Sequence, residues 1–206
     1  MKRSNLLVGT LALAALTGAA QAQITNSAHD FSSYAWSGGE ICRPCHTPHF
    51  ANVAAGRLWN HALSTATYTL FEGETGTSAD LDRESRLCMG CHDGTVALDS
   101  FGGTTGTNYI PGGANIGTDL RNDHPIGRDA IYPTTPSTRF NPQNASHQVP
   151  GAWGTLRLKS WIDGAGAEQW VVGCRTCHNV HNAGNFGHML NFSNQSSHLC
   201  LTCHIK

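Results

Sequence analysis

The chain has 206 residues, 13 of them basic and 14 acidic, and a formal net charge of −1. Only 13% of the residues are charged, 23 are glycine, and 12 His stand beside 8 Cys. The chain has no run of basic residues that would indicate nucleic-acid binding. The scarcity of helix-forming residues argues against a helical bundle. With little material for a large apolar core, we expect something other than side chains to fill the middle of the fold.

Residues 1–22 have the pattern of a secretory signal peptide. A basic start precedes an apolar run over residues 6–16, and the small-x-small sequence at residues 20–22 is a cleavage site. The apolar run is too short to span a bilayer. We therefore expect residues 23–206 to be exported, without membrane insertion, to the cell surface or beyond, with the periplasm as the alternative. Their formal charge is −3, from 11 basic and 14 acidic residues.

All eight cysteines fall into C-x-x-C pairs, and a histidine follows each pair directly. The four motifs are Cys42, Cys45 and His46; Cys88, Cys91 and His92; Cys174, Cys177 and His178; and Cys200, Cys203 and His204. C-x-x-C-H is the attachment signature of c-type haem, in which two thiols bond the haem vinyl groups and the histidine ligates the iron. Zinc sites, thioredoxin-like pairs and disulfides do not require that histidine four times out of four. The motifs predict four covalently attached haems c.

This haem load predicts the fold class. The 184 residues after residue 22 provide 46 for each haem, so the porphyrins themselves would form most of the core. We expect a mostly irregular, coil-rich chain wrapped around a stacked haem chain. Short helices are expected at the C-x-x-C-H sites, with at most a small β-hairpin.

The motifs form two similar pairs. The pattern C-R-x-C-H-x-x-H of residues 42–49 recurs at residues 174–181, and the pattern S-x-L-C-x-x-C-H of residues 85–92 recurs at residues 197–204. The chain therefore reads as an internal duplication, with two haems in each half.

The duplication predicts one tetrahaem domain over residues 23–206. The motif pairs occupy about 23–99 and 155–206, and a stretch rich in Gly, Asn and Pro, about 100–154, joins them. We expect that stretch to be an irregular loop that covers haem faces. A turn around Asp163-Gly164 predicts a hairpin within residues 155–172.

Iron with two imidazole ligands needs a second histidine at each haem. Eight histidines lie outside the motifs: His29, His49, His61, His124, His147, His181, His188 and His198. His49 and His181 each follow a motif histidine by three residues and share a face of the same helical turn with it. Each is predicted to ligate a second haem packed beside that turn, rather than the haem attached next to it.

Two further histidines complete the predicted set of distal ligands. His29 precedes a carboxylate of the kind that orients a ligating imidazole, and His124 precedes a proline that restrains the backbone. His61 and His188 follow aromatic residues in the two spacers and are alternates. His198 aligns with an arginine in the duplication, so its position does not demand an imidazole.

The stretches ICRPCHTPH, LWNH, SRLCMGCHDGTVA, DHPI, CRTCHNVHN and SHLCLTCHIK resemble the doubled C-x-x-C-H multihaem cytochromes. Within that family the chain is most similar to the small tetrahaem cytochromes of metal-reducing bacteria that polymerise outside the cell into conducting nanowire filaments. The resemblance implies bis-His haems, little regular secondary structure and a stacked haem chain. Its ligand positions match His29, His49, His124 and His181, while members often have Arg at the position of His61.

These features predict an electron-transfer protein rather than an enzyme. Iron that holds two imidazoles has no open position for a substrate, and no C-x-x-C-K motif of a multihaem reductase is present. The last motif is followed by Ile205 and Lys206, so we expect the fourth haem near the surface, where a second copy could cover it. The expected partners are copies of the same chain, joined head to tail, and other redox cytochromes or extracellular electron acceptors. The alternatives are a soluble periplasmic tetrahaem shuttle and, with less support, a reductase.

Overall fold

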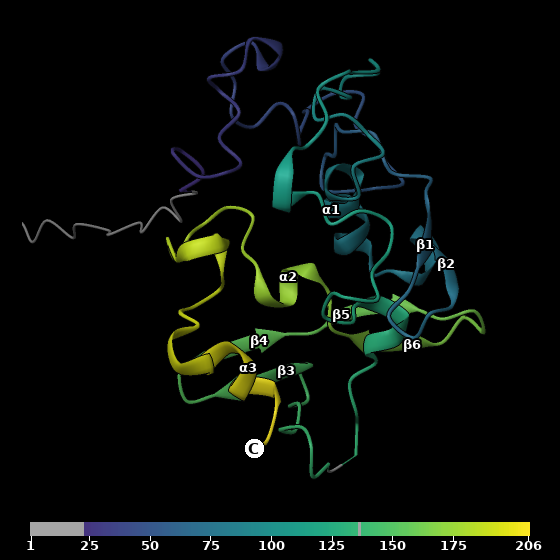
Figure 1. Cartoon of the computed structure of the whole chain (residues 1–206), viewed down its shortest axis with the longest axis vertical. Coiled ribbons are helices and arrows are strands. Elements are labelled where there is room, and N and C mark those ends of the chain that lie inside the picture. Colours follow the sequence, from purple (N-terminus) through teal and green to yellow (C-terminus); the bar gives the residue numbers. More distant parts are fainter. Residues whose placement is uncertain (1–22, 136) are drawn as a thin grey trace, which may run out of the picture.

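The computed structural model describes residues 23–135 and 137–206, so the predicted signal peptide, residues 1–22, lies outside the described residues. Most of the described chain is irregular, and its regular elements are short (Figure 1). No helix in these two ranges has the length and hydropathy to cross a membrane. The predicted coil-rich fold with a few short helices is confirmed at this level.

Helices coincide with three of the four C-x-x-C-H motifs. They are α1 (Arg83–His92), α2 (Cys174–Cys177) and α3 (His198–Cys203). The buried Asp82 carboxylate caps α1 by accepting the amide protons of Glu84 and Ser85, each at 3.1 Å. The first motif forms only a single helical turn. Gly38 and Gly39, just before it, adopt positive φ values of 68° and 82°, which stop a helix from extending toward the N-terminus.

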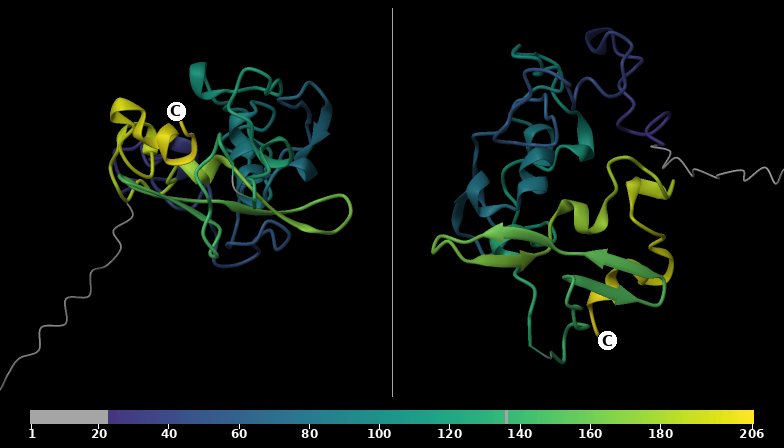
Figure 2. Two further views of the ribbon diagram at one scale, coloured as in Figure 1. Left: turned by 90° about the horizontal axis from the view of Figure 1, so that it is seen from below. Right: turned by 180° about the vertical axis from the view of Figure 1, so that it is seen from behind.

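The strands form three separate antiparallel hairpins, where the sequence predicted at most one. They are β1 (Thr67–Thr69) with β2 (Thr75–Thr77), β3 (Gln148–Gly151) with β4 (Gly154–Arg157), and β5 (Lys159–Ile162) with β6 (Glu168–Val171). The predicted hairpin is β5–β6, whose turn Asp163 closes by accepting the amide protons of Ala165 and Ala167. Figure 2 shows this turn projecting away from the C-terminal segment. Strand β3 arises within the stretch that was expected to be irregular.

Buried apolar side chains gather in two small clusters rather than one large core. One lies between the β3–β4 hairpin and α3 and contains Tyr132, Val149, Leu156, Leu158, Phe192 and Cys203. The other lies between α1 and the β1–β2 hairpin and contains Tyr68, Leu70, Leu81, Met89 and Leu120. Each cluster therefore supports one motif helix, and neither spans the molecule.

The long stretch between the motif pairs is tied to two motifs. The amide of Ile116 donates to the carbonyl of His92 at 2.8 Å, and the amide of Asn141 donates to the carbonyl of Cys203 at 2.8 Å. The stretch thus packs against the second and fourth motifs.

The N-terminal segment folds back over its own chain. The amide of Gln23 donates to the carbonyl of His181 at 2.9 Å. Phe31 and Trp36 pack with ring centroids 5.3 Å apart, and Trp36 reaches Phe101 at 6.1 Å. This packing brings His29 close to the motif on α1.

We predict that Leu156→Ala lowers the free energy of unfolding of the holoprotein by about 2–5 kcal/mol, because it leaves a cavity behind a side chain that is only 2% exposed. Guanidinium unfolding, followed by near-ultraviolet circular dichroism, measures the change. The control is Leu58→Ala, at a side chain that is 57% exposed, which should change stability by about 0.5 kcal/mol or less. Equal effects of the two substitutions would contradict the packing described here.

Candidate haem-attachment sites

The C-x-x-C-H motifs share one backbone turn. The amide of the histidine donates to the carbonyl of the first cysteine, at 2.8 Å for His46, 3.0 Å for His178 and 2.9 Å for His204. The second motif lies inside α1. Because residues four apart lie on one face of a helical turn, the first thiol and the imidazole point to the same side. All eight cysteines are unbridged, as covalent attachment to haem requires.

The environment of the sulfur atoms suits a thioether. Burial raises the pKa of Cys45 to about 11 and the pKa values of Cys91 and Cys177 to about 12. Burial disfavours a thiolate at these three positions, whereas a thioether carries no charge and tolerates burial. At Cys174 the neighbouring Cys88 instead lowers the pKa. Across residues 23–135 and 137–206, no three His, Cys, Asp or Glu side chains converge as a metal site.

Backbone carbonyls orient three of the four motif histidines. The Nδ1 of His46 bonds the carbonyl of Arg57 at 2.8 Å, that of His92 bonds Ala114 at 2.8 Å, and that of His178 bonds His188 at 2.9 Å. When Nδ1–H donates to a carbonyl, the proton is fixed there and Nε2 is left to bind a metal. The sequence did not predict these hydrogen-bond partners, because a residue of any type can supply a backbone carbonyl.

Three motif histidines face a predicted distal ligand. The ring centroids are 6.3 Å apart for His46 and His181, 6.0 Å for His92 and His29, and 6.3 Å for His204 and His124. Two imidazoles on opposite sides of one metal ion have centroids about 6 Å apart, given metal–nitrogen bonds of about 2.0 Å. The spacing therefore fits a bis-His iron site, although ligation itself stays a prediction. His181 meets the histidine of the first motif rather than its own neighbour His178, which is the crossed arrangement that the sequence predicted.

Two of the predicted distal ligands, His29 and His181, are in the neutral form that can bind a metal ion. Burial, followed by the nearby charge of His92, lowers the pKa of His29 to about 4. Burial also lowers the pKa of His181. Both imidazoles are therefore neutral at pH 7, and only a neutral imidazole binds a metal ion. The Nδ1 of His124 bonds the carbonyl of Pro125 at 2.9 Å, which again frees Nε2.

The remaining motif histidine, His178, and the remaining predicted distal ligand, His49, are not brought together. His49 is exposed on the loop after the first motif. Within the described parts of the chain, neither His49 nor His178 forms a ring pair like the other three. His49 as the distal ligand of a second haem stays a prediction.

The remaining histidines have other roles in the structure. His61 is 2% exposed; its Nδ1 lies 2.8 Å from the carbonyl of Ala62 and its Nε2 lies 3.0 Å from the carbonyl of Ala97, and a neutral ring can donate to one of the two. His147 stacks on Trp170 at 3.7 Å, and His198 stacks on Trp153 at 3.9 Å. The alternate His188 contributes its backbone carbonyl to His178.

The attachment sites lie next to one another in chain order. Cys88 and Cys174 shift each other's pKa, which places their thiols close together. Cys91 is within electrostatic range of Cys45, and Cys177 is within range of both cysteines of the fourth motif. The first site thus neighbours the second, the second neighbours the third, and the third neighbours the fourth, while the first and third motifs also meet through His46 and His181. We call this the row of attachment sites.

Residues 169–206 match the family model for the doubled CXXCH motif. No curated protein matches the chain. The matched segment holds the third and fourth motifs, and this spacing implies covalently bound haem c. The match supports a doubled CXXCH multihaem cytochrome.

We predict that His181→Ala opens one iron of the holoprotein, on the haem attached at the first motif, because His181 is paired with His46. One of the four irons should become high-spin and bind carbon monoxide after reduction, as measured by electron paramagnetic resonance and absorbance. His29→Ala and His124→Ala should each do the same at the second and fourth motifs.

The matched control is His147→Ala, which removes an imidazole that is stacked on Trp170. Its spectra should remain those of the wild type. Low-spin spectra in all three ligand variants would show that these ring pairs do not ligate iron.

Proposed function

We propose that the protein transfers electrons through four covalently attached, bis-His haems c and serves as the subunit of an extracellular conducting filament. The observation that carries electron transfer is the row of attachment sites, whose first and last members each present an exposed cysteine. Cys42 in the first motif and Cys200 in the last are exposed, Cys203 in the last motif is buried, and the cysteines of the two inner motifs are partly exposed. Electrons can therefore enter and leave at opposite ends of the row.

In this proposal the side chains of the protein ligate the haem irons and hold the haems at fixed spacings. Bound haem supplies a one-electron iron couple, and two imidazoles on an iron leave no position for a substrate. Bis-His ligation also lacks the Met ligand that raises the potentials of cytochromes c, so low potentials are expected. These points favour an electron carrier over a multihaem reductase.

Exposed apolar side chains at both ends of the row support assembly. Phe50 and Val53, on the loop after the first motif, are 105% and 92% exposed, and Ile205 after the last motif is 46% exposed. The fourth motif's His204 is exposed as well. Contact between two different ends of the same chain is heterologous, and it gives an open filament when the rotation does not close. A soluble shuttle, which would use the same bare ends for transient docking, is the alternative.

We predict that the exported protein carries four haems, because every cysteine belongs to a complete motif. Mass spectrometry of the denatured, secreted protein should show four haem additions and no free thiol. Replacing both Cys200 and Cys203 by Ser should remove one haem and leave three. Bound zinc, or a thiol that reacts with alkylating reagent in the wild type, would overturn haem attachment.

We predict that the native secreted protein forms fibres, and that Phe50→Asp combined with Val53→Asp prevents them, because a charge at the contact opposes burial of the apolar surface. Sedimentation and electron microscopy of the haem-loaded protein measure the assembly. Tyr109→Asp, at a side chain that is 55% exposed elsewhere, is the control and should leave fibres intact. A stable single-chain species at high concentration, with no fibres on grids, would refute the filament and favour the shuttle.

A further inference from the structure

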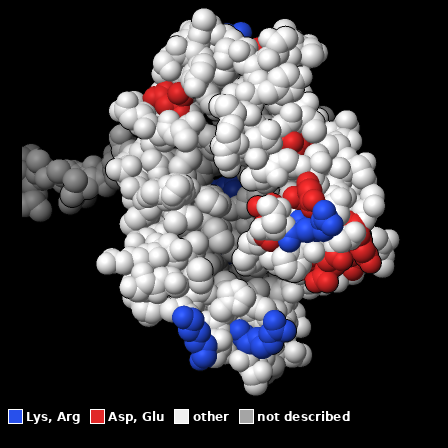
Figure 3. Space-filling view, viewed as in Figure 1, with Lys and Arg blue, Asp and Glu red and all other residues white. Residues whose placement is uncertain are grey.

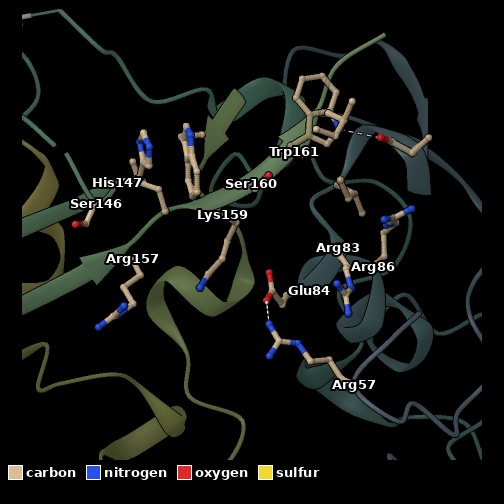
Figure 4. Close-up of a pocket in the computed structure, with 15 residues that line it drawn as sticks. Arg57, Arg83, Glu84, Arg86, Ser146, His147, Arg157, Lys159, Ser160 and Trp161 are labelled. Carbon is tan, nitrogen blue, oxygen red and sulfur yellow. Dashed lines mark hydrogen bonds and ion pairs between the residues drawn. The ribbon is translucent and has the colours of Figure 1, made fainter. Parts of the chain in front are cut away.

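A cavity of about 740 Å³ lies between β5, the first turn of α1 and the loop at Arg57. Five cationic side chains line it, namely Arg57, Arg83, Arg86, Arg157 and Lys159. In Figure 4 Arg157 and Lys159 come from the strand side, while the other three approach from the side of α1. Glu84 lies between Lys159 and Arg57 and is the single carboxylate of the lining. The lining therefore has a formal charge of +4.

This concentration of positive charge is unusual for the chain. Residues 23–206 have 11 basic and 14 acidic residues, and five of those eleven line this one cavity. Outside the cavity, Arg128 pairs with Glu74, Asp80 and Asp129, whereas Arg43 and Arg139 have no carboxylate within 4.0 Å among the described residues. Figure 3 shows blue and red side chains side by side at the right of this face and two blue groups at its lower edge with no red beside them.

The single carboxylate is shared between two guanidinium groups. Glu84 lies 3.2 Å from Arg57 and 4.0 Å from Arg175, which belongs to the third motif. The other four lining cations have no carboxylate within 4.0 Å among the described residues. The Nε of Arg175 is buried and, in the part of the chain that the structure describes, has no hydrogen-bond partner. Burial lowers the pKa of Lys159, which marks a cation whose charge is incompletely stabilised.

Part of the cavity wall is apolar and firmly held. Trp161 is 7% exposed, and its Nε1–H donates to the carbonyl of Ala79 at 2.8 Å. Trp170, Leu81 and Leu158 complete this wall. The volume falls in the range of about 300–1,000 Å³ that is typical of small-ligand sites, which combine apolar walls with a few placed polar groups.

We propose that this cavity binds a ligand with two or more carboxylate or phosphate groups. Guanidinium groups match the paired oxygens of both anions. Two sources present this chemistry: the propionate side chains of the protein's own haems, and a free multivalent anion. The carbonyl of Arg57 bonds His46, and Arg175 lies between the cysteines of the third motif, so bound negative charge would lie close to two attachment sites.

The test uses the haem-loaded protein, with haem content verified by mass spectrometry for each variant. Pyrophosphate is titrated at low ionic strength by calorimetry, and the propionate bending modes are recorded by resonance Raman spectroscopy. The variants are Arg157→Gln and Lys159→Gln. The control is Arg121→Gln, at an exposed arginine that pairs only with Asp119 outside the cavity.

One pyrophosphate per chain, bound about tenfold more weakly by each cavity variant than by the control, would identify a free anion as the ligand. No pyrophosphate binding, together with propionate modes that shift in the cavity variants and not in the control, would identify the haem propionates. If pyrophosphate does not bind and the propionate modes do not move, the proposal is overturned. Because haem content is measured separately, this failure differs from a failure of haem attachment.

Discussion

The hydrogen bond between the Nδ1 of a motif histidine and a distant backbone carbonyl is the interaction on which the candidate sites depend. It leaves Nε2 free at His46, His92 and His178. The carbonyls of Ala114 and His188 belong to short 3₁₀ helices and that of Arg57 belongs to a turn, so these segments must hold fixed positions although they have little regular structure. The irregular backbone of this chain therefore has a specific task, which is to present carbonyl oxygens at the motif histidines.

The imidazole pairs place the rest of the chain. Each pair joins two segments that are far apart in the sequence: the N-terminal segment meets α1, the third motif meets the first, and the long central stretch meets α3. The apolar clusters are small and each supports one motif helix. Such small clusters bury limited apolar surface, so bound haem, by bridging these segments, would contribute much of the stability that a larger core supplies in other proteins.

Charge has a separate distribution from the imidazole pairs. Five of the eleven basic residues in residues 23–206 face one cavity beside the first and third motifs. Positive charge near a haem favours its reduced form, and an anion in the cavity would oppose that effect. The cavity thus offers a means to tune potentials without changing any iron ligand.

The sequence by itself determined the features that depend on neighbouring residues. The C-x-x-C-H spacing places two thiols and an imidazole within one helical turn, so four attachment sites were predictable, as were the coil-rich fold and the β5–β6 turn at Asp163. The C-H-x-x-H spacing also indicated that His181 faces a haem other than its neighbour. Only the tertiary structure decided that His29 meets His92, that His61 is buried beside two backbone carbonyls, that three hairpins form, and that five cations share a cavity. These outcomes depend on the path of long loops. That path is set by backbone hydrogen bonds between remote segments, and residue types do not predict such bonds because every residue has a backbone carbonyl.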